Sequence, residues 1–87
     1  MTSPIVPTVH VNGTSREALM AQRSDAIRAL HVARKALAEA APNARDFPSG
    51  GYPEAVTQHE QRLDAITKVI RSIDAERQAI FASRREA

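Results

Sequence analysis

The chain has no cysteine and no tryptophan, and its three aromatic residues are one Tyr and two Phe. The lack of cysteine excludes a disulfide and a cysteine-based zinc site within this sequence. No run of about 18 apolar residues occurs, so we expect no membrane-spanning helix. Residues 1–11 show neither a basic n-region nor a continuous apolar stretch, so we expect no secretory signal and a cytoplasmic protein.

An excess of one charge is also missing, because 12 basic residues stand against 10 acidic ones. The two signs alternate along the chain, as in Glu60, Arg62 and Asp64. Such mixing is typical of solvated helix faces. A nucleic-acid interface usually shows a stripe of basic residues with aromatic neighbours. We therefore do not expect nucleic acid as a partner.

The apolar content is 43%, but 16 of the 87 residues are alanine, which adds little to a core. A chain of this length forms a single domain, 1–87, that buries a modest share of its surface. One small domain rarely encloses a pocket of several hundred Å³ on its own. We expect stability to come from regular helix packing and self-association, and we do not expect an enzyme.

The first part of the chain, 1–14, is predicted to be extended. Pro4 and Pro7 disfavour helix in the residues before them. Two valines, Val9 and Val11, alternate with polar residues, which predicts a short strand. Asn12-Gly13 follows as a turn signal.

Two long helices are predicted, over 15–41 and 54–83, with a loop over 42–53 that contains three prolines and two glycines. Ser15 is the expected N-cap of the first helix, with Thr14 as the alternative because Glu17 would then complete a capping box. The predicted apolar seam of the first helix is Leu19, Ala26, Leu30, Ala33, Leu37 and Ala40. The predicted seam of the second is Val56, His59, Leu63, Ile66, Ile70, Ile73, Arg77 and Ile80.

These elements predict an all-α fold, an antiparallel two-helix hairpin with an extended N-terminal strand segment. The hairpin leaves outer apolar stripes without cover, namely Met20, Ile27, Val69 and Phe81. The strand has no partner strand in its own chain, so it either lies along the hairpin as a strap or pairs with another subunit. Both features predict a homo-oligomer.

The candidates for metal binding and catalysis are few. The three histidines are not spaced as ligands on one helix, and no HExxH motif occurs, so we predict no metal site and no cofactor. No catalytic residues are predicted, because nothing places a serine, a histidine and an acid together. His59 lies on the apolar seam and is expected to be buried and bonded to a neighbour.

A first polar cluster lies at the end of the hairpin that is far from the loop. Arg23 and Arg77 interrupt the two seams there, close to Asn12, Thr14 and Arg16. The two guanidiniums either reach past the hairpin end into solvent or form an anion-binding corner with the nearby turn and helix N-terminus. For the second possibility, Asn12, Thr14 and Arg16 are the predicted ligand-binding residues.

A second polar cluster occupies the loop, where Asn43, Arg45, Asp46 and Tyr52 lie within ten residues of one another. Arginine binds phosphate or carboxylate, asparagine offers a donor and an acceptor, and tyrosine stacks on a base or a sugar. We predict these four residues as further ligand contacts. The alternative is that they serve only the chemistry of the turn.

The stretches 9–17, VHVNGTSRE, and 40–46, AAPNARD, resemble a group of small helical-hairpin proteins of tailed bacteriophages. The resemblance covers about residues 9–80 and implies an N-terminal strand, an Asn-Gly-Thr turn and two helices around a Pro-Asn-x-Arg-Asp loop. It implies the cytoplasm of a host cell but no particular activity. In size and architecture alone, the chain is also similar to phage anti-defence sponges, which are helical oligomers that sequester cyclic nucleotide signals.

The two polar clusters lie at opposite ends of a hairpin about 40 Å long, so they can meet only between subunits. We therefore expect a non-enzymatic phage accessory protein that sequesters a cyclic nucleotide or a related anionic small molecule at inter-subunit sites. The alternative is a structural or protein-interaction protein, such as a phage assembly factor or an inhibitor of a host protein. An enzyme would require His31 or His59 to share a cleft with a carboxylate.

Overall fold

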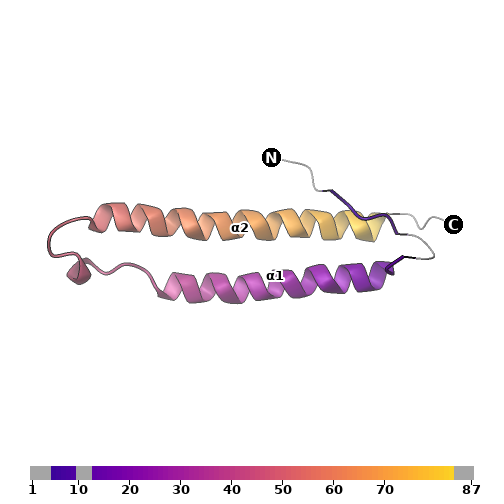
Figure 1. Ribbon diagram of the computed structural model, residues 1–87, viewed down its shortest axis with the longest axis horizontal. Helices are drawn as coiled ribbons and strands as arrows, with labels where there is room; N and C mark the ends of the chain where they lie inside the picture. Colours follow the sequence, from indigo (N-terminus) through magenta and orange to yellow (C-terminus); the bar gives the residue numbers. More distant parts are fainter. Residues whose placement is uncertain (1–4, 10–12, 84–87) are drawn as a thin grey trace.

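The computed structural model describes residues 5–9 and 13–83. Helix α1 (Arg16–Glu39) and helix α2 (Tyr52–Ala82) run antiparallel, and the connection between them contains a 3-10 turn, η1 (Ala44–Asp46) (Figure 1). The described residues are all-helical apart from turns and extended segments, and they contain no strand. The helical hairpin is thus confirmed. His10, Val11 and Asn12, on which the predicted strand and turn depend, lie outside the described residues.

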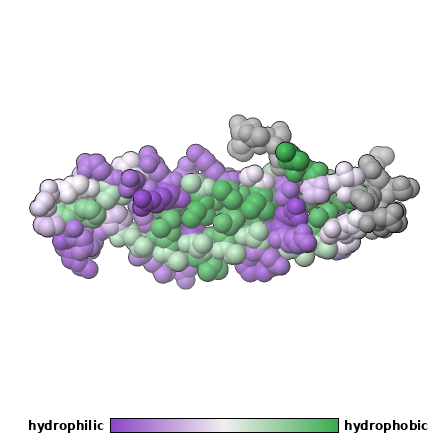
Figure 2. All heavy atoms as spheres, viewed as in Figure 1, coloured by the Kyte–Doolittle hydropathy of each residue, from purple (hydrophilic) through white to green (hydrophobic). Residues whose placement is uncertain are grey.

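The hairpin is a single layer of two helices, and the chain as a whole measures 65 × 23 × 15 Å along its principal axes. A layer this thin cannot enclose most of its apolar side chains. Val9, Leu19, Ile27 and Ile80 are the buried hydrophobic residues of the described part. Figure 2 shows the consequence, because apolar residues remain visible along the middle of the hairpin over both helices.

Both helices begin with local signals that the sequence contains. The Oγ of Ser15 accepts a hydrogen bond from the backbone N–H of Ala18 at 3.1 Å, so Ser15 rather than Thr14 caps α1. Helix α2 begins after Gly51, whose φ of +97° suits glycine and few other residues. Pro53 lies in the first turn of α2, where its missing N–H costs no helical hydrogen bond.

The predicted seam of α2 is confirmed. His59 and Ile80 are buried, and the other six members of the seam are half-buried between the helices. An unbroken alternation of spacings of three and four therefore identified the inner face of this helix correctly.

The predicted seam of α1 is confirmed for Leu19, Leu30 and Leu37, which are buried or half-buried, and is wrong for its three alanines. Ala26, Ala33 and Ala40 are exposed. Six residues turned toward α2 are buried or half-buried, namely the predicted Leu30 and Leu37 together with Met20, Arg23, Ile27 and Arg34. Two of these six are arginines, whose apolar stems lie in the seam while their guanidiniums reach polar groups. Periodicity alone therefore does not separate this inner face from the neighbouring alanine stripe.

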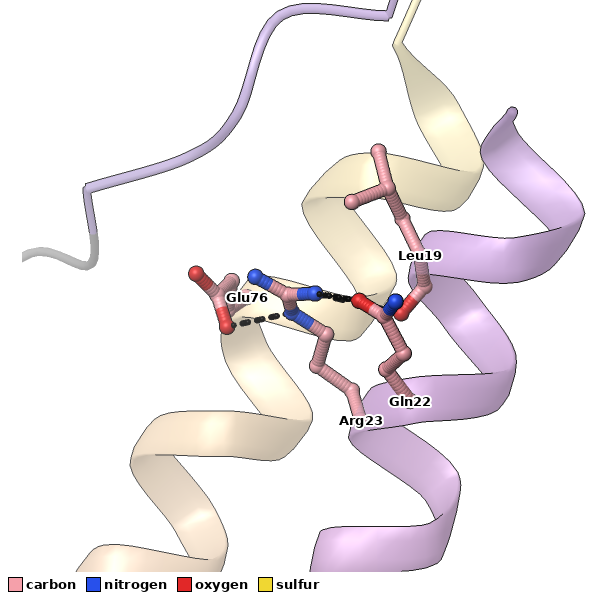
Figure 3. Close-up of polar contacts among 4 residues, drawn as sticks. All are labelled: Leu19, Gln22, Arg23 and Glu76. Atoms are coloured by element: carbon pink, nitrogen blue, oxygen red, sulfur yellow. Dashed lines mark hydrogen bonds and ion pairs between the residues drawn. The ribbon is translucent and has the colours of Figure 1, made fainter. Parts of the chain in front are cut away.

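Polar contacts across the hairpin fix the register of the two helices. Arg23 Nε lies 3.0 Å from Glu76 Oε1, and the same guanidinium donates to Gln22 Oε1 at 2.9 Å (Figure 3). Farther along, Arg34 Nε donates to Thr67 Oγ1 at 2.8 Å. Residue 23 is thus level with residue 76, and residue 34 is level with residue 67.

The described N-terminal segment, residues 5–9, lies over the terminal end of the hairpin, and we call it the strap (Figure 1). Val9 is buried in one cluster with Leu19 of α1 and Ile80 of α2, while Val6 and Met20 pack against that cluster. Of the two predicted arrangements, this part of the segment adopts the first, because it covers its own hairpin. The cluster is the best-enclosed part of the described chain.

Of the four residues predicted to form exposed apolar stripes, two are exposed and two are covered. Val69 and Phe81 are exposed as expected, and Val32 is exposed as well. Met20 and Ile27 are covered within the chain, which corrects the expectation for these two residues. The reason is that both residues belong to the inner face of α1.

Candidate ligand-binding groove

A hollow of about 510 Å³ lies at the loop end of the hairpin, between the last turn of α1, η1 and the first turns of α2. We call it the loop-end groove. Its apolar lining includes Leu37, Ala40 and Phe47. Its polar lining includes Asp46, His59 and Arg62, together with Gln58. The groove therefore combines an aromatic ring, a cation, a carboxylate and an imidazole in one place.

His59 is the most informative of these side chains, because only 8% of its surface is exposed. Its Nε2 is buried and has no hydrogen-bond partner among the described residues. Leaving a buried polar atom without a partner costs about 1–3 kcal/mol. The expectation that His59 is buried is confirmed, but the expected bond to a neighbour is not formed by this atom. An imidazole nitrogen donates or accepts according to its tautomer, so a ligand atom of either kind satisfies it.

Arg62 follows His59 by three residues, which places the two side chains on neighbouring positions of one helix face. The guanidinium of Arg62 makes one long hydrogen bond, 3.4 Å, to Gln58 Oε1 on the same helix. No carboxylate of the described residues lies within ion-pair distance of Arg62. Most of its donors are therefore available to an anion.

The predicted loop residues have different roles. Asn43 shapes the turn, because its Oδ1 accepts the backbone N–H of Arg45 at 3.0 Å. Asp46 and Arg45 are both exposed, but Asp46 lines the loop-end groove and Arg45 does not. The ring of Tyr52 packs against Phe47, with centroids 6.1 Å apart and planes tilted by 51°. The structure thus brings Asp46 to the groove and gives Tyr52 a supporting position behind Phe47.

The predicted cluster at the other end of the hairpin is arranged differently. Thr14 is exposed, and Asn12 lies outside the described residues. Arg16 donates a hydrogen bond to the backbone carbonyl of Ser83, just beyond the C-terminal end of α2. Cations at this position satisfy carbonyls that the helix leaves open, so Arg16 joins the two helix ends.

Arg23 and Arg77 do not form an anion-binding corner, and they do not extend freely into solvent. Arg23 is paired with Glu76, and Arg77 is paired with Asp74 and also donates to Ser24 Oγ at 3.0 Å. A charged group in a seam needs a compensating partner, and both arginines find carboxylates on α2. This correction removes the two guanidiniums from the candidate ligand contacts.

Three residues of the groove were missed by sequence reasoning, namely Phe47, His59 and Arg62. His59 was attributed to the core because it lies on the apolar seam. The usable signal was its position at the end of that seam, beside a proline-rich connection that cannot cover it with a helix. His59 and Asp46 do share a groove, the arrangement that an enzyme would need, but no hydrogen bond joins them among the described contacts.

A second hollow, of about 370 Å³, lies along the first turns of α2 and is lined by Pro53, Glu54, Thr57, Gln58 and Gln61. Its lining carries no cation and no aromatic ring, so it offers less to a ligand. Within the described residues, no group of three or more His, Asp or Glu side chains is arranged to hold a metal ion. Neither described helix has a stretch long and apolar enough to cross a membrane.

Comparison with protein-family models, with curated proteins and with solved structures gives no match to this chain.

Proposed function

We propose that the protein is a non-enzymatic binding module that holds a small anionic, nucleotide-like molecule in the loop-end groove and acts as a homo-oligomer. The observation that carries the proposal is the buried Nε2 of His59, which lacks a partner among the described residues in a groove that also carries Arg62. A buried donor or acceptor of this kind is satisfied when a ligand atom reaches it.

Three side chains of the groove each match one part of a nucleotide. The guanidinium of Arg62 suits a phosphate, to which it can donate two parallel hydrogen bonds. The ring of Phe47, supported by Tyr52, offers a face for a base. Asp46 can accept hydrogen bonds from a ribose hydroxyl or a base amino group. The volume of about 510 Å³ lies within the usual range of small-molecule sites.

Thermal melting with and without ligand tests the proposal, using AMP, cyclic AMP and cyclic di-AMP as probes. A ligand that binds only the folded chain stabilises it by about 2.7 kcal/mol at one hundred times its dissociation constant. We expect at least one probe to raise the melting temperature and to be recovered unchanged in a mass spectrum after incubation. A converted probe would contradict the non-enzymatic part of the proposal.

Two matched variants locate the site. Arg62→Gln removes the cation of the groove and should abolish most of the shift, whereas Arg71→Gln removes an exposed cation of the same helix away from the groove. His59→Asn should weaken the shift as well, because the buried acceptor or donor is displaced. The proposal fails if no probe shifts the transition, or if the Arg62 and Arg71 variants respond alike.

A second candidate function, that of a structural or protein-interaction protein, is favoured by the apolar residues left open along the hairpin (Figure 2). An assembly factor or an inhibitor of a host protein would use that surface rather than the loop-end groove. The two candidates differ in their response to Arg62→Gln, which removes ligand binding in the first and leaves partner binding unchanged in the second.

A further inference from the structure

One stripe of α1 connects the two ends of the hairpin on a single side. Leu19, Ala26, Ala33 and Ala40 recur at a spacing of seven, which keeps them on one side of the helix with a small drift. Leu19 lies beneath the strap, and Ala40 lines the loop-end groove. Ala26 and Ala33, between them, are exposed. The stripe therefore runs from the strap to the groove.

A matching stripe of α2 lies on the same side of the hairpin. Ala55, Arg62, Val69 and Glu76 also recur at a spacing of seven. Ala55 and Arg62 line the loop-end groove together with Ala40, and Glu76 pairs with Arg23 near the strap. The alanine face is defined here as Ala26, Ala33 and Ala40 of α1 with Ala55 and Val69 of α2.

The strap and the groove give this face a ridge at one end and a hollow at the other. The strap lies on the face at Leu19 and Ile80, and the groove opens on it at Ala40 and His59. Along α2, the point halfway between Ile80 and His59 falls at Val69, which is 47% exposed. Rotation by 180° about an axis that lies in the plane of the interface at this level, perpendicular to the helix axes, would place a ridge over a hollow at both ends.

We propose that a second copy of the chain packs on the alanine face in antiparallel orientation, so that the strap of each copy covers the loop-end groove of the other. In the parallel arrangement the two straps would meet at the same end and hold the faces apart. In the antiparallel one the exposed Ile5, with 92% of its surface in solvent, reaches the partner's groove, whose apolar wall includes Leu37, Ala40 and Phe47.

The size and composition of the face suit a dimer. Helix α1 has 24 residues and is therefore about 36 Å long, a length that the same helix of an antiparallel second copy matches. Alanine side chains allow helices to approach closely, toward the short end of the usual spacing between axes.

The pairing explains how so small a chain could enclose a ligand. The loop-end groove of one copy is an open hollow, and the strap of the second copy would close it. The pairing itself follows from the alanine face, the ridge and the hollow. Only the statement that the closed groove holds an anion rests on the proposed function.

Single cysteine variants test the arrangement, because the natural chain has no cysteine that would interfere. Val69→Cys places a thiol next to the proposed axis, and Val32→Cys places one at an exposed position outside the alanine face. A disulfide forms only where the Cα atoms come within about 7 Å of each other. Under mild oxidation we expect covalent dimers with Val69→Cys and monomers with Val32→Cys, and equal yields would overturn the proposal.

The orientation is tested by mixing Ile5→Cys with Ala40→Cys. The antiparallel pair predicts disulfides between the two variants, whereas disulfides between two copies of Ile5→Cys would show the parallel arrangement and overturn the proposal. Probe melting with the cross-linked protein separates this inference from the proposed function. If Arg62→Gln abolishes probe binding while cross-linking is intact, the result concerns the ligand site. If a probe binds but Val69→Cys does not cross-link, the pairing alone is refuted.

Discussion

Truncation of Ile80 provides a sharp test of the strap, because it compares two neighbouring residues with opposite burial. Ile80 is 0% exposed beneath Val9, whereas Phe81 is 67% exposed on the adjacent position. From hydrophobicity and size alone, Phe81 would be expected to contribute more to stability. The structure predicts the reverse order.

The magnitude follows from the atoms that are removed. Ile80→Ala deletes three buried carbon groups, at about 0.8 kcal/mol each for transfer. The space left between the strap and both helices adds a cavity cost, so we expect a loss of about 3–4 kcal/mol in the free energy of unfolding. Phe81→Ala removes a ring that is mostly in water already, and we expect a loss of about 0.5 kcal/mol.

The assay is urea denaturation followed by circular dichroism of the helices, at one protein concentration for all variants because self-association adds to stability. Ile80→Val serves as an intermediate variant, with an expected loss of about 1 kcal/mol. If Ile80→Ala costs no more than Phe81→Ala, then the strap does not cover Ile80 and the reasoning about the terminal end of the hairpin is wrong.

Two further variants test local features. The double-mutant cycle of Arg23→Met and Glu76→Gln, measured by urea denaturation, should give a coupling of about 1 kcal/mol in the free energy of unfolding. The pair is largely shielded from solvent and joins the two helices. A coupling near zero would contradict the ion pair. Gly51→Ala should lower the free energy of unfolding by about 1–2 kcal/mol, because the φ of +97° at the N-cap of α2 is unfavourable for residues with a Cβ. An unchanged melting temperature would show that the connection adopts another conformation.

The two helices differ in how well their sequences predicted their packing. In α2 every seam position but His59 and Arg77 carries a large aliphatic residue, so the inner face is unambiguous. In α1 the alanine stripe and the true seam both recur with helical spacing, and leucines at positions 30 and 37 belong to both patterns. The choice between them depends on Arg23 and Arg34, whose partners Glu76 and Thr67 lie more than thirty residues away in sequence.

The candidate site was predictable only in its location. The loop sequence indicated polar contacts near Asp46, and that residue does line the groove. For His59 the one usable signal was its position beside the proline-rich connection. Arg62 could not be assigned, because its surroundings come from α1 and η1 as well as from its own helix. Arg16 was predicted to contact a ligand because of its charge. In the structure its guanidinium instead donates a hydrogen bond to the backbone carbonyl of Ser83.

Sedimentation equilibrium on three proteins tests the central claim, that the alanine face pairs two copies. The natural chain and Val32→Glu, whose change lies outside that face, should sediment with twice the chain mass of 9.5 kDa at high micromolar concentration. Ala33→Glu keeps a good helix former but places a charge in the middle of the face, and it should sediment as a single chain. A single-chain mass for the natural protein, or an Ala33→Glu variant that still pairs, would contradict the account.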